Sequence, residues 1–273
     1  QGSAPLASDA VWPTYGRDNQ RTGLASRASP VGSASFTPGQ DWTVPTASIE
    51  INESLKQGLL AHYEFNGNAD DSSGNGHHAS IYGAVTAPGR YEKANQALLF
   101  DGVDDRVKLP RVDILGNKKT FSIFAWIKVD EHNSSSGSQS IYGEYGTSPG
   151  RNIFLIQNHK VLFEQYPPSG GVDEGKGAQP IQLRHWHLVG YAESNGKWSV
   201  YLDGSINASG GGAETWAIRP LEASFIGARY YTHRTPGNFK DFFGGSIDEV
   251  RLYDRALLPL EVKALYNGEM PNP

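Results

Sequence analysis

The hydrophobic positions of this chain fall into short runs separated by turn residues, from about residue 58 onward. Several runs alternate apolar and polar residues. The run 121–129 is apolar at nearly every position, which is typical of a strand buried on both faces. Between the runs 186–192 and 197–202 stands Asn195-Gly196, which predicts a tight hairpin because both turn residues must take positive φ. The pattern predicts many short antiparallel strands.

The remaining runs predict further strands of similar length, separated by polar loops. These expected strands cover residues 59–65, 97–100, 106–109, 141–145, 153–157, 160–165, 225–228 and 246–253. One segment, 259–266, predicts a short helix, because Pro259 stands at its start and Asn267-Gly268 supplies a stop. Helices between the strands, which a parallel sheet would need, are missing from the pattern. We therefore expect an all-β fold, a sandwich of two antiparallel sheets with one short C-terminal helix.

The first 56 residues differ from the rest of the chain. They are rich in Ser, Ala, Pro, Gly and Thr and carry no sustained periodicity. We expect residues 1–56 to form an irregular N-terminal arm or linker, followed by a β-sandwich over residues 57–273. Such an arm could instead add a strand to the open sheet edge of a second copy, so that subunits self-associate into a polymer.

Composition narrows the range of functions. The formal net charge is −5 and the chain has no run of Lys and Arg, so we expect no nucleic-acid partner. No stretch approaches about 18 apolar residues, so we expect no membrane span. The chain has no cysteine, which excludes disulfides, thiol catalysis and zinc held by cysteine. Its 273 residues are enough to bury a core without such crosslinks.

Three segments resemble, in order, the signatures of laminin-G-like domains of the concanavalin A-like superfamily. Residues 63–77, Tyr-Glu-Phe-Asn-Gly-Asn-Ala-Asp-Asp-Ser-Ser-Gly-Asn-Gly-His, are similar to the opening strand and loop. Residues 97–107, Ala-Leu-Leu-Phe-Asp-Gly-Val-Asp-Asp-Arg-Val, are similar to a second signature. Residues 244–257, Gly-Gly-Ser-Ile-Asp-Glu-Val-Arg-Leu-Tyr-Asp-Arg-Ala-Leu, are similar to the closing strand and turn. The resemblance implies a jelly-roll sandwich, an extracellular or cell-surface setting and often a structural calcium ion.

The resemblance also implies where calcium would bind. Asp71 is the loop carboxylate of the matching motif, and Asp248 corresponds to the closing-strand acid that reaches back to the opening loop. The loop that begins at Asn66 is dense in oxygen ligands and glycine, and Ca²⁺ takes about six to eight oxygens. We expect a calcium site at Asp71, Asp248 and Asn66, with Asp248 facing inward. The alternative for Asp248 is an ion pair with Arg251 or a turn cap.

A second acidic group leaves two interpretations open. The turn 101–105, Asp-Gly-Val-Asp-Asp, joins two expected strands. Its carboxylates could form another calcium site, or they could stabilise the turn by bonding to its own backbone N–H groups.

Sugar sites combine aromatic rings with a few polar groups. The segment 229–238, Arg-Tyr-Tyr-Thr-His-Arg-Thr-Pro-Gly-Asn, offers both between two expected strands, and Tyr145 lies on another expected rim. We expect ligand-binding residues at Tyr145, Tyr230, Tyr231, His233 and Arg234. The alternative is that these tyrosines only cover the edge of the sandwich.

The chain lacks the residue pattern of glycosidases with this fold. Those enzymes place two Glu and an Asp at alternate positions of one strand, and no Glu-x-Asp-x-x-Glu run occurs here. Asp248 and Glu249 are adjacent, so strand alternation would send them to opposite faces. We therefore expect a secreted, non-catalytic binding or adhesion module for glycan or matrix protein. The alternatives are a structural subunit assembled through residues 1–56 and a cryptic hydrolase or lyase.

Overall fold

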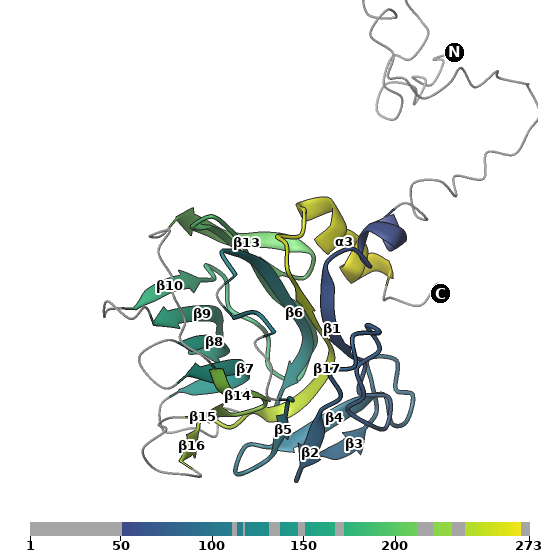
Figure 1. Cartoon of the computed structure of the whole chain (residues 1–273). Helices are drawn as coiled ribbons and strands as arrows, with labels where there is room; N and C mark the ends of the chain where they lie inside the picture. Colours follow the sequence, from purple (N-terminus) through teal and green to yellow (C-terminus); the bar gives the residue numbers. More distant parts are fainter. Residues whose placement is uncertain are drawn as a thin grey trace, which may run out of the picture. The chain divides into compact units, whose positions relative to one another are not determined.

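The structure is a computed structural model that describes residues 51–110, 114–116, 118–130, 137–146, 151–166, 172–211, 221–230 and 238–268. The described part of the chain folds as two antiparallel sheets packed face to face (Figure 1). A helix, α3 (Pro259–Gly268), follows the last strand. The predicted all-β sandwich with a short C-terminal helix is confirmed. Residues 1–50, and with them most of the predicted arm, lie outside the described residues.

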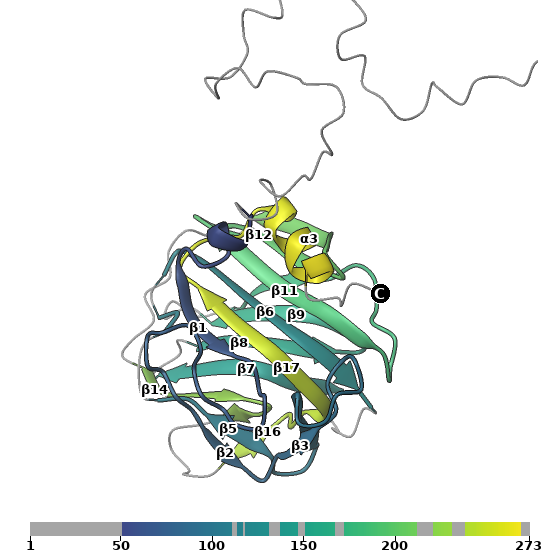
Figure 2. The same cartoon turned by 90° about the vertical axis from the view of Figure 1, so that its right-hand side faces the viewer.

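The first sheet has eight strands and carries the helix on its outer face. Its order is β13-β12-β11-β6-β17-β4-β3, with β1 paired to β17, and the sheet faces the viewer in Figure 2. The strands are β1 Leu59–Tyr63, β3 Val85–Ala87, β4 Ala97–Asp101, β6 Thr120–Val129, β11 Trp186–Ser194, β12 Lys197–Leu202, β13 Ser205–Gly211 and β17 Gly244–Tyr253.

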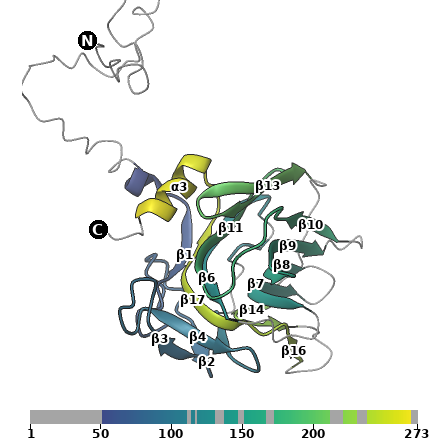
Figure 3. The same ribbon diagram turned by 180° about the vertical axis from the view of Figure 1, so that it is seen from behind.

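The second sheet has seven strands in the order β10-β9-β8-β7-β14-β5-β2, and Figure 3 shows the two layers from behind. A two-stranded ribbon, β15-β16, follows β14 in the chain. The strands are β2 Ser80–Tyr82, β5 Arg106–Lys108, β7 Ser138–Gly146, β8 Arg151–Gln157, β9 Lys160–Tyr166, β10 Asp173–Lys176, β14 Leu221–Ile226, β15 Arg229–Tyr230 and β16 Phe239–Lys240.

The hydrophobic core lies between the two sheets. Strand alternation sends every second residue inward, and these positions are large and apolar. Phe163 of β9 and Tyr191 of β11 stack with ring centroids 4.0 Å apart, and Phe121 of β6 packs against both. The predicted hairpin at Asn195-Gly196 is confirmed, since both residues have positive φ, 49° and 76°.

A second apolar cluster lies between the eight-stranded sheet and α3. Trp126 of β6, which is 2% exposed, stacks on Tyr266 of α3 with ring centroids 5.6 Å apart. Ser54, in the segment preceding β1, donates a hydrogen bond to Glu261 of α3. Arg255 binds both Glu261 oxygens at 2.8 Å and the carbonyl of Ser54 at 2.7 Å. Residues just before β1 therefore contact α3, although the sequence assigns residues up to 56 to the arm.

A β-bulge in β17 places two neighbouring acidic side chains on the same face of the sheet. Asp248 lies opposite Trp126, and the register shifts before Arg251, so one extra residue of β17 is accommodated there. Glu249 has a φ of 52° at this point. Its carboxylate contacts His62 at 2.6 Å and Arg251 at 2.7 Å, on the outer side of the sheet. The expectation that Asp248 faces inward is wrong, because Asp248 alternates with the core residue Ile247 and lies opposite the outward Trp126. The expectation that Glu249 faces away from Asp248 is also wrong, because the bulge interrupts strand alternation.

Candidate functional site

A row of aromatic rings and one guanidinium crosses the outer face of the seven-stranded sheet. Its members come from four elements that lie side by side, β2, β5, β14 and the β15-β16 ribbon (Figures 1 and 2). Outward positions of these strands carry the row because their alternate residues, such as Val107, fill the core. We call this set the aromatic row: Tyr82, Arg106, Phe225, Tyr230 and Phe239.

Contacts between neighbouring members make the row continuous. The ring of Tyr230 is 5.2 Å from that of Phe239 and 6.1 Å from that of Phe225. The guanidinium carbon of Arg106 lies 4.6 Å from the ring centroid of Phe239 and 5.0 Å from that of Tyr82. These distances are typical of aromatic stacking and of cation–π contacts. Tyr82 is 43% exposed, so the end of the row at β2 is accessible to a ligand.

A buried ionic group adjoins the row on the ribbon side. Arg229 of β15 lies 3.2 Å from Asp241 and 3.8 Å from Glu164 of β9. Burial acts to lower the pKa of Arg229, but the neighbouring Tyr145, Glu164 and Asp241 raise it above its ordinary value. The guanidinium is therefore charged, and it joins β15 to the sheet.

The structure describes two of the five predicted sugar-binding residues. Tyr145 is 5% exposed, and its ring meets that of Tyr230 edge-on at 5.9 Å. Tyr230 is half-buried in the aromatic row. The buried ring of Tyr145 thus packs against the ring of Tyr230. The other three, Tyr231, His233 and Arg234, lie outside the described residues, and the site as a whole stays a prediction.

The β2–β5 end of the row was not among the predicted site residues. A signal was available, since Arg106 and Lys108 are two residues apart in an expected strand and must share its outer face. The contact with Phe239 could not be read from the sequence, because more than 130 residues separate the two side chains.

Backbone N–H groups donate hydrogen bonds to the carboxylate of Asp71, the first predicted calcium ligand. Its Oδ1 accepts hydrogen bonds from the N–H groups of His62 and Ser73, and its Oδ2 accepts one from His77, each at 2.9 Å. Burial acts to raise the pKa of Asp71, but these bonds lower it below its ordinary value. Asp71 therefore fixes the opening loop against β1.

The other two predicted calcium ligands have partners of their own. Asp248 Oδ2 lies 2.8 Å from Arg90, whose guanidinium supplies the positive charge that a metal would bring. Burial raises the pKa of Asp248 to about 7 in spite of Arg90. Asn66 donates a hydrogen bond to Glu64 at 3.0 Å. The arrangement does not favour calcium at Asp71, Asp248 and Asn66, and that ligand set stays a prediction.

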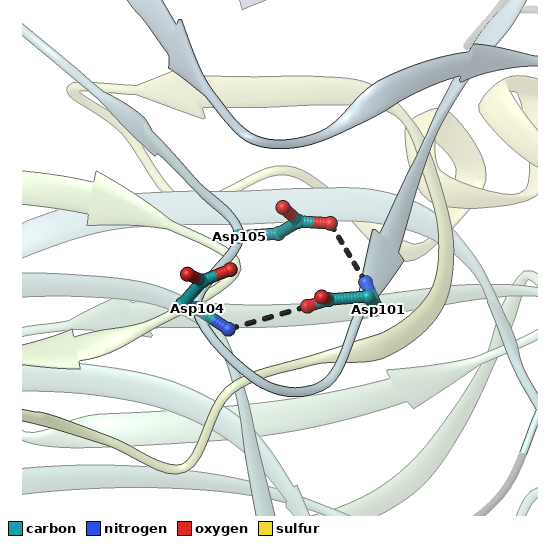
Figure 4. A group of neighbouring side chains, drawn as sticks. All are labelled: Asp101, Asp104 and Asp105. Atoms are coloured by element: carbon teal, nitrogen blue, oxygen red, sulfur yellow. Dashed lines mark hydrogen bonds between the residues drawn. The ribbon is translucent and has the colours of Figure 1, made fainter.

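The turn between β4 and β5 brings three carboxylates together. Among the described residues, Asp101, Asp104 and Asp105 form the group of acidic side chains whose ligand atoms lie within 4.8 Å of one another (Figure 4). Asp101 Oδ1 accepts bonds from the N–H groups of Val103 at 2.8 Å and Asp104 at 3.2 Å, as an Asx turn does. The turn-stabilising role is thus confirmed, and the same residues could hold a cation.

The buried member of this group is Asp105, which accepts a hydrogen bond from the N–H of Asp101 at 2.8 Å. Burial first, and the neighbouring Asp101 and Asp104 charges as well, raise the pKa of Asp105 above its ordinary value. Gly83 is required beside it, because a Cβ there would lie 1.9 Å from the Asp105 carboxylate. Asp101 and Asp105 line a cleft of about 450 Å³ together with Asp130. A cation would offset the repulsion among these acids.

No helix in the described part of the chain is both long and apolar enough to cross a membrane.

Comparisons with known proteins agree with the fold. A family model described as the concanavalin A-like lectin/glucanases superfamily matches residues 101–263, more than half of the chain. The human neuronal pentraxin receptor is 26% identical over 158 residues, which are 55% of this chain and 30% of the receptor. The chain thus spans less than a third of the length of that relative.

Two solved structures share the architecture. One is domain 4 of AbnA, an extracellular GH43 arabinanase from Geobacillus stearothermophilus, in complex with arabinotriose. It gives a TM-score of 0.61 at 21% identity over 76% of this chain and 98% of that domain. The other is the botulinum neurotoxin serotype D ligand-binding domain in complex with N-acetylneuraminic acid, with a TM-score of 0.64 at 13% identity over 80% of this chain and 53% of that one. With the family match over residues 101–263, these findings show that the chain belongs to the concanavalin A-like lectin/glucanases superfamily.

Proposed function

We propose that this protein is a non-catalytic, extracellular glycan-binding module, and that the aromatic row on the seven-stranded sheet is its binding surface. The observation that carries the proposal is the continuous contact from Tyr230 through Phe239 and Arg106 to the exposed ring of Tyr82. Sugar rings have apolar faces that pack on aromatic rings and hydroxyls that bond to polar groups beside them. Two structural neighbours solved with bound sugars support the proposal.

The acidic groups beside the row support binding without catalysis. Glycosidases need one carboxyl group that protonates the leaving oxygen and a second that attacks or activates water. Here Glu164 and Asp241 both face Arg229, at 3.8 and 3.2 Å. Both carboxylates are thus engaged by one guanidinium, an arrangement that does not match the acid and nucleophile pair of a glycosidase.

A glycan array tests the proposal. The 273-residue chain should bind one class of oligosaccharide, and Tyr230→Ala should weaken that binding at least about tenfold, because the row loses its central ring. Leu260→Ala is the matched control, since Leu260 is 64% exposed on α3, far from the seven-stranded sheet. Equal binding by wild type and Tyr230→Ala, both shown to be folded by circular dichroism, would assign the glycan to another surface. No binding to any glycan would refute the function.

Calcium is the second part of the proposal, at Asp101, Asp104 and Asp105. Three carboxylates with ligand atoms within 4.8 Å suit a hard cation that prefers oxygen. The role would be structural, since a bound ion would hold the β4–β5 turn beside the row. Asp104 is exposed, and its carboxylate makes none of the hydrogen bonds that close the turn.

Thermal unfolding with calcium and with EDTA tests this site. Calcium should raise the Tm of the wild type and of the control Glu174→Gln, an exposed acid on β10, and should leave Asp104→Asn unchanged. A calcium effect that Asp104→Asn retains would place the ion elsewhere, and no effect on the wild type would remove calcium from the proposal.

A further inference from the structure

The guanidinium of Arg106 contacts two aromatic rings, and among the described residues it has no carboxylate partner. The guanidinium carbon lies 5.0 Å from the ring centroid of Tyr82 and 4.6 Å from that of Phe239. Among the described residues its hydrogen bond is one from Nη1 to the backbone carbonyl of Asp104, at 2.8 Å. The remaining N–H groups of the fork are thus left for an external acceptor.

Other arginines of the structure differ in this respect. Four of them lie within 3.2 Å of a carboxylate; the pairs are Arg90–Asp248, Arg229–Asp241, Arg251–Glu249 and Arg255–Glu261. A half-buried guanidinium without a counter-ion is costly, because desolvation is not offset by an opposite charge. Contacts with two rings restrict the guanidinium of Arg106 in advance, which lowers the entropy lost when an anion binds.

A second cation lies beside Arg106 on the same face of β5. Lys108 is two residues along the strand, exposed, and without a carboxylate partner among the described residues. Across the ladder, Tyr82 lies opposite Arg106 and Ser80 lies opposite Lys108. An exposed ring, a fixed guanidinium, an ammonium and a hydroxyl therefore meet on two adjacent strands, in a protein whose net charge is −5.

The acidic turn next to β5 does not neutralise this group. Asp104 meets Arg106 through its backbone carbonyl, and Asp105 is buried against the N–H of Asp101. Two cations on a short strand are too few for a nucleic-acid backbone, which needs an extended basic surface. They match a ligand that carries a single acidic group next to a ring with an apolar face.

We infer that Tyr82, Arg106 and Lys108 form a subsite for a carboxylated sugar, so that the ligand of the aromatic row is an acidic glycan built from uronic acid residues. The inference rests on the proposed glycan-binding function. The planar fork of Arg106 takes the carboxylate through two parallel hydrogen bonds, Tyr82 packs on the sugar ring, and Lys108 adds a second positive charge.

Calorimetry with matched ligands tests the inference. The probes are a panel of uronic acid tetrasaccharides and the methyl ester of each, which keeps the sugar backbone and removes the charge. The intact protein should bind at least one acid about tenfold or more tightly than its ester, and added salt should shrink the difference. Arg106→Gln should abolish the preference, and Arg106→Lys, which keeps the charge without the fork, should retain part of it. The exposed Lys263→Gln on α3 is the control.

The outcomes separate the two proposals. If acid and ester bind equally while Tyr230→Ala removes the binding of both, the glycan function stands and the acidic subsite is wrong. If the array finds a neutral glycan and no uronic acid tetrasaccharide binds, the subsite is again wrong. If no glycan of any kind binds, both fail. A melting curve for each Arg106 variant distinguishes lost recognition from lost folding.

Discussion

The two outer faces of the sandwich differ in the exposure of their aromatic rings and in the pairing of their charged side chains. The face of the eight-stranded sheet is closed, because α3 covers Trp126 and the charged groups beside it are paired, as in Arg90–Asp248 and Arg251–Glu249. The face of the seven-stranded sheet ends in an exposed ring, Tyr82, and in an arginine without a carboxylate partner among the described residues.

The two faces are expected to respond differently to substitution. A paired, covered charge contributes to folding only after its desolvation cost is met, and it has no capacity left for a ligand. A half-buried charge without a counter-ion costs some stability but keeps its hydrogen-bonding capacity for a ligand. Substitutions on the first face should therefore change stability, and substitutions on the second should change binding.

The largest expected effect is on the covered face, at Trp126. Trp126→Ala removes a side chain that is 2% exposed and that contacts both Tyr266 and Arg90. The free energy of unfolding should fall by about 3–5 kcal/mol, as for other large aromatic truncations in cores. Urea denaturation followed by circular dichroism measures the loss. A decrease below about 1 kcal/mol would show that α3 is not essential to this face.

An intermediate effect is expected at Glu261, which holds α3 to Ser54 and Arg255. Burial acts to raise the pKa of Glu261, but the bonds from Arg255, Ser54 and the N–H of Leu258 lower it from 4.5 to about 2. Because the folded pKa lies below the ordinary value, the stabilisation is present above pH 4.5 and is lost as the pH falls toward 2. Glu261→Gln should cost about 2 kcal/mol at pH 7, within the range of hydrogen bonds to a charged group.

Stability measured against pH checks the sign of this effect. Between pH 4.5 and 2, Glu261→Gln should lose less stability than the wild type, since it has no carboxylate to protonate there. Glu174→Gln, which changes an exposed acid of β10, should follow the wild-type curve. Parallel curves for Glu261→Gln and wild type would mean that another group causes the loss of stability between pH 4.5 and 2.

The smallest effect on stability is expected on the open face, at Tyr82. Tyr82→Ala should change the free energy of unfolding by less than about 0.5 kcal/mol, because the ring is 43% exposed. Glycan affinity should nevertheless fall about tenfold, since the ring packs on the sugar and on Arg106. Paired melting and binding measurements on one preparation test the contrast. A large loss of stability with unchanged binding would reverse the roles of the two faces.

Much of the fold could be predicted, because local patterns encode it. Alternation and the turn Asn195-Gly196 locate the hairpin β11–β12, and Pro259 with Asn267-Gly268 locates α3. The strands β2, β3, β10, β13, β15 and β16 were missed. All but β13 are two to four residues long, too short to show a period, and their pairing partners alone define them. The seven residues of β13 form a largely exposed edge strand with little apolar pattern.

The candidate site could be predicted only in part, for a related reason. Tyr230 lies in a segment whose composition indicated sugar binding, and the row described here contains it. Glu249 was misplaced because a bulge at φ 52° leaves no reliable mark in the sequence. Asp248 was expected to reach a metal, whereas its partner is Arg90, which is 158 positions away.

The sequence by itself determined the fold class, the absence of cysteine chemistry and the family, since each depends on composition, short periods or motifs in fixed order. Only the tertiary structure decided which charges are neutralised and which remain available to a ligand. The physical reason is that ion pairs and cation–π contacts act over a few ångströms between side chains brought together by sheet pairing. The environment of Arg106, set by Tyr82 and Phe239, exists only after the sheets have formed.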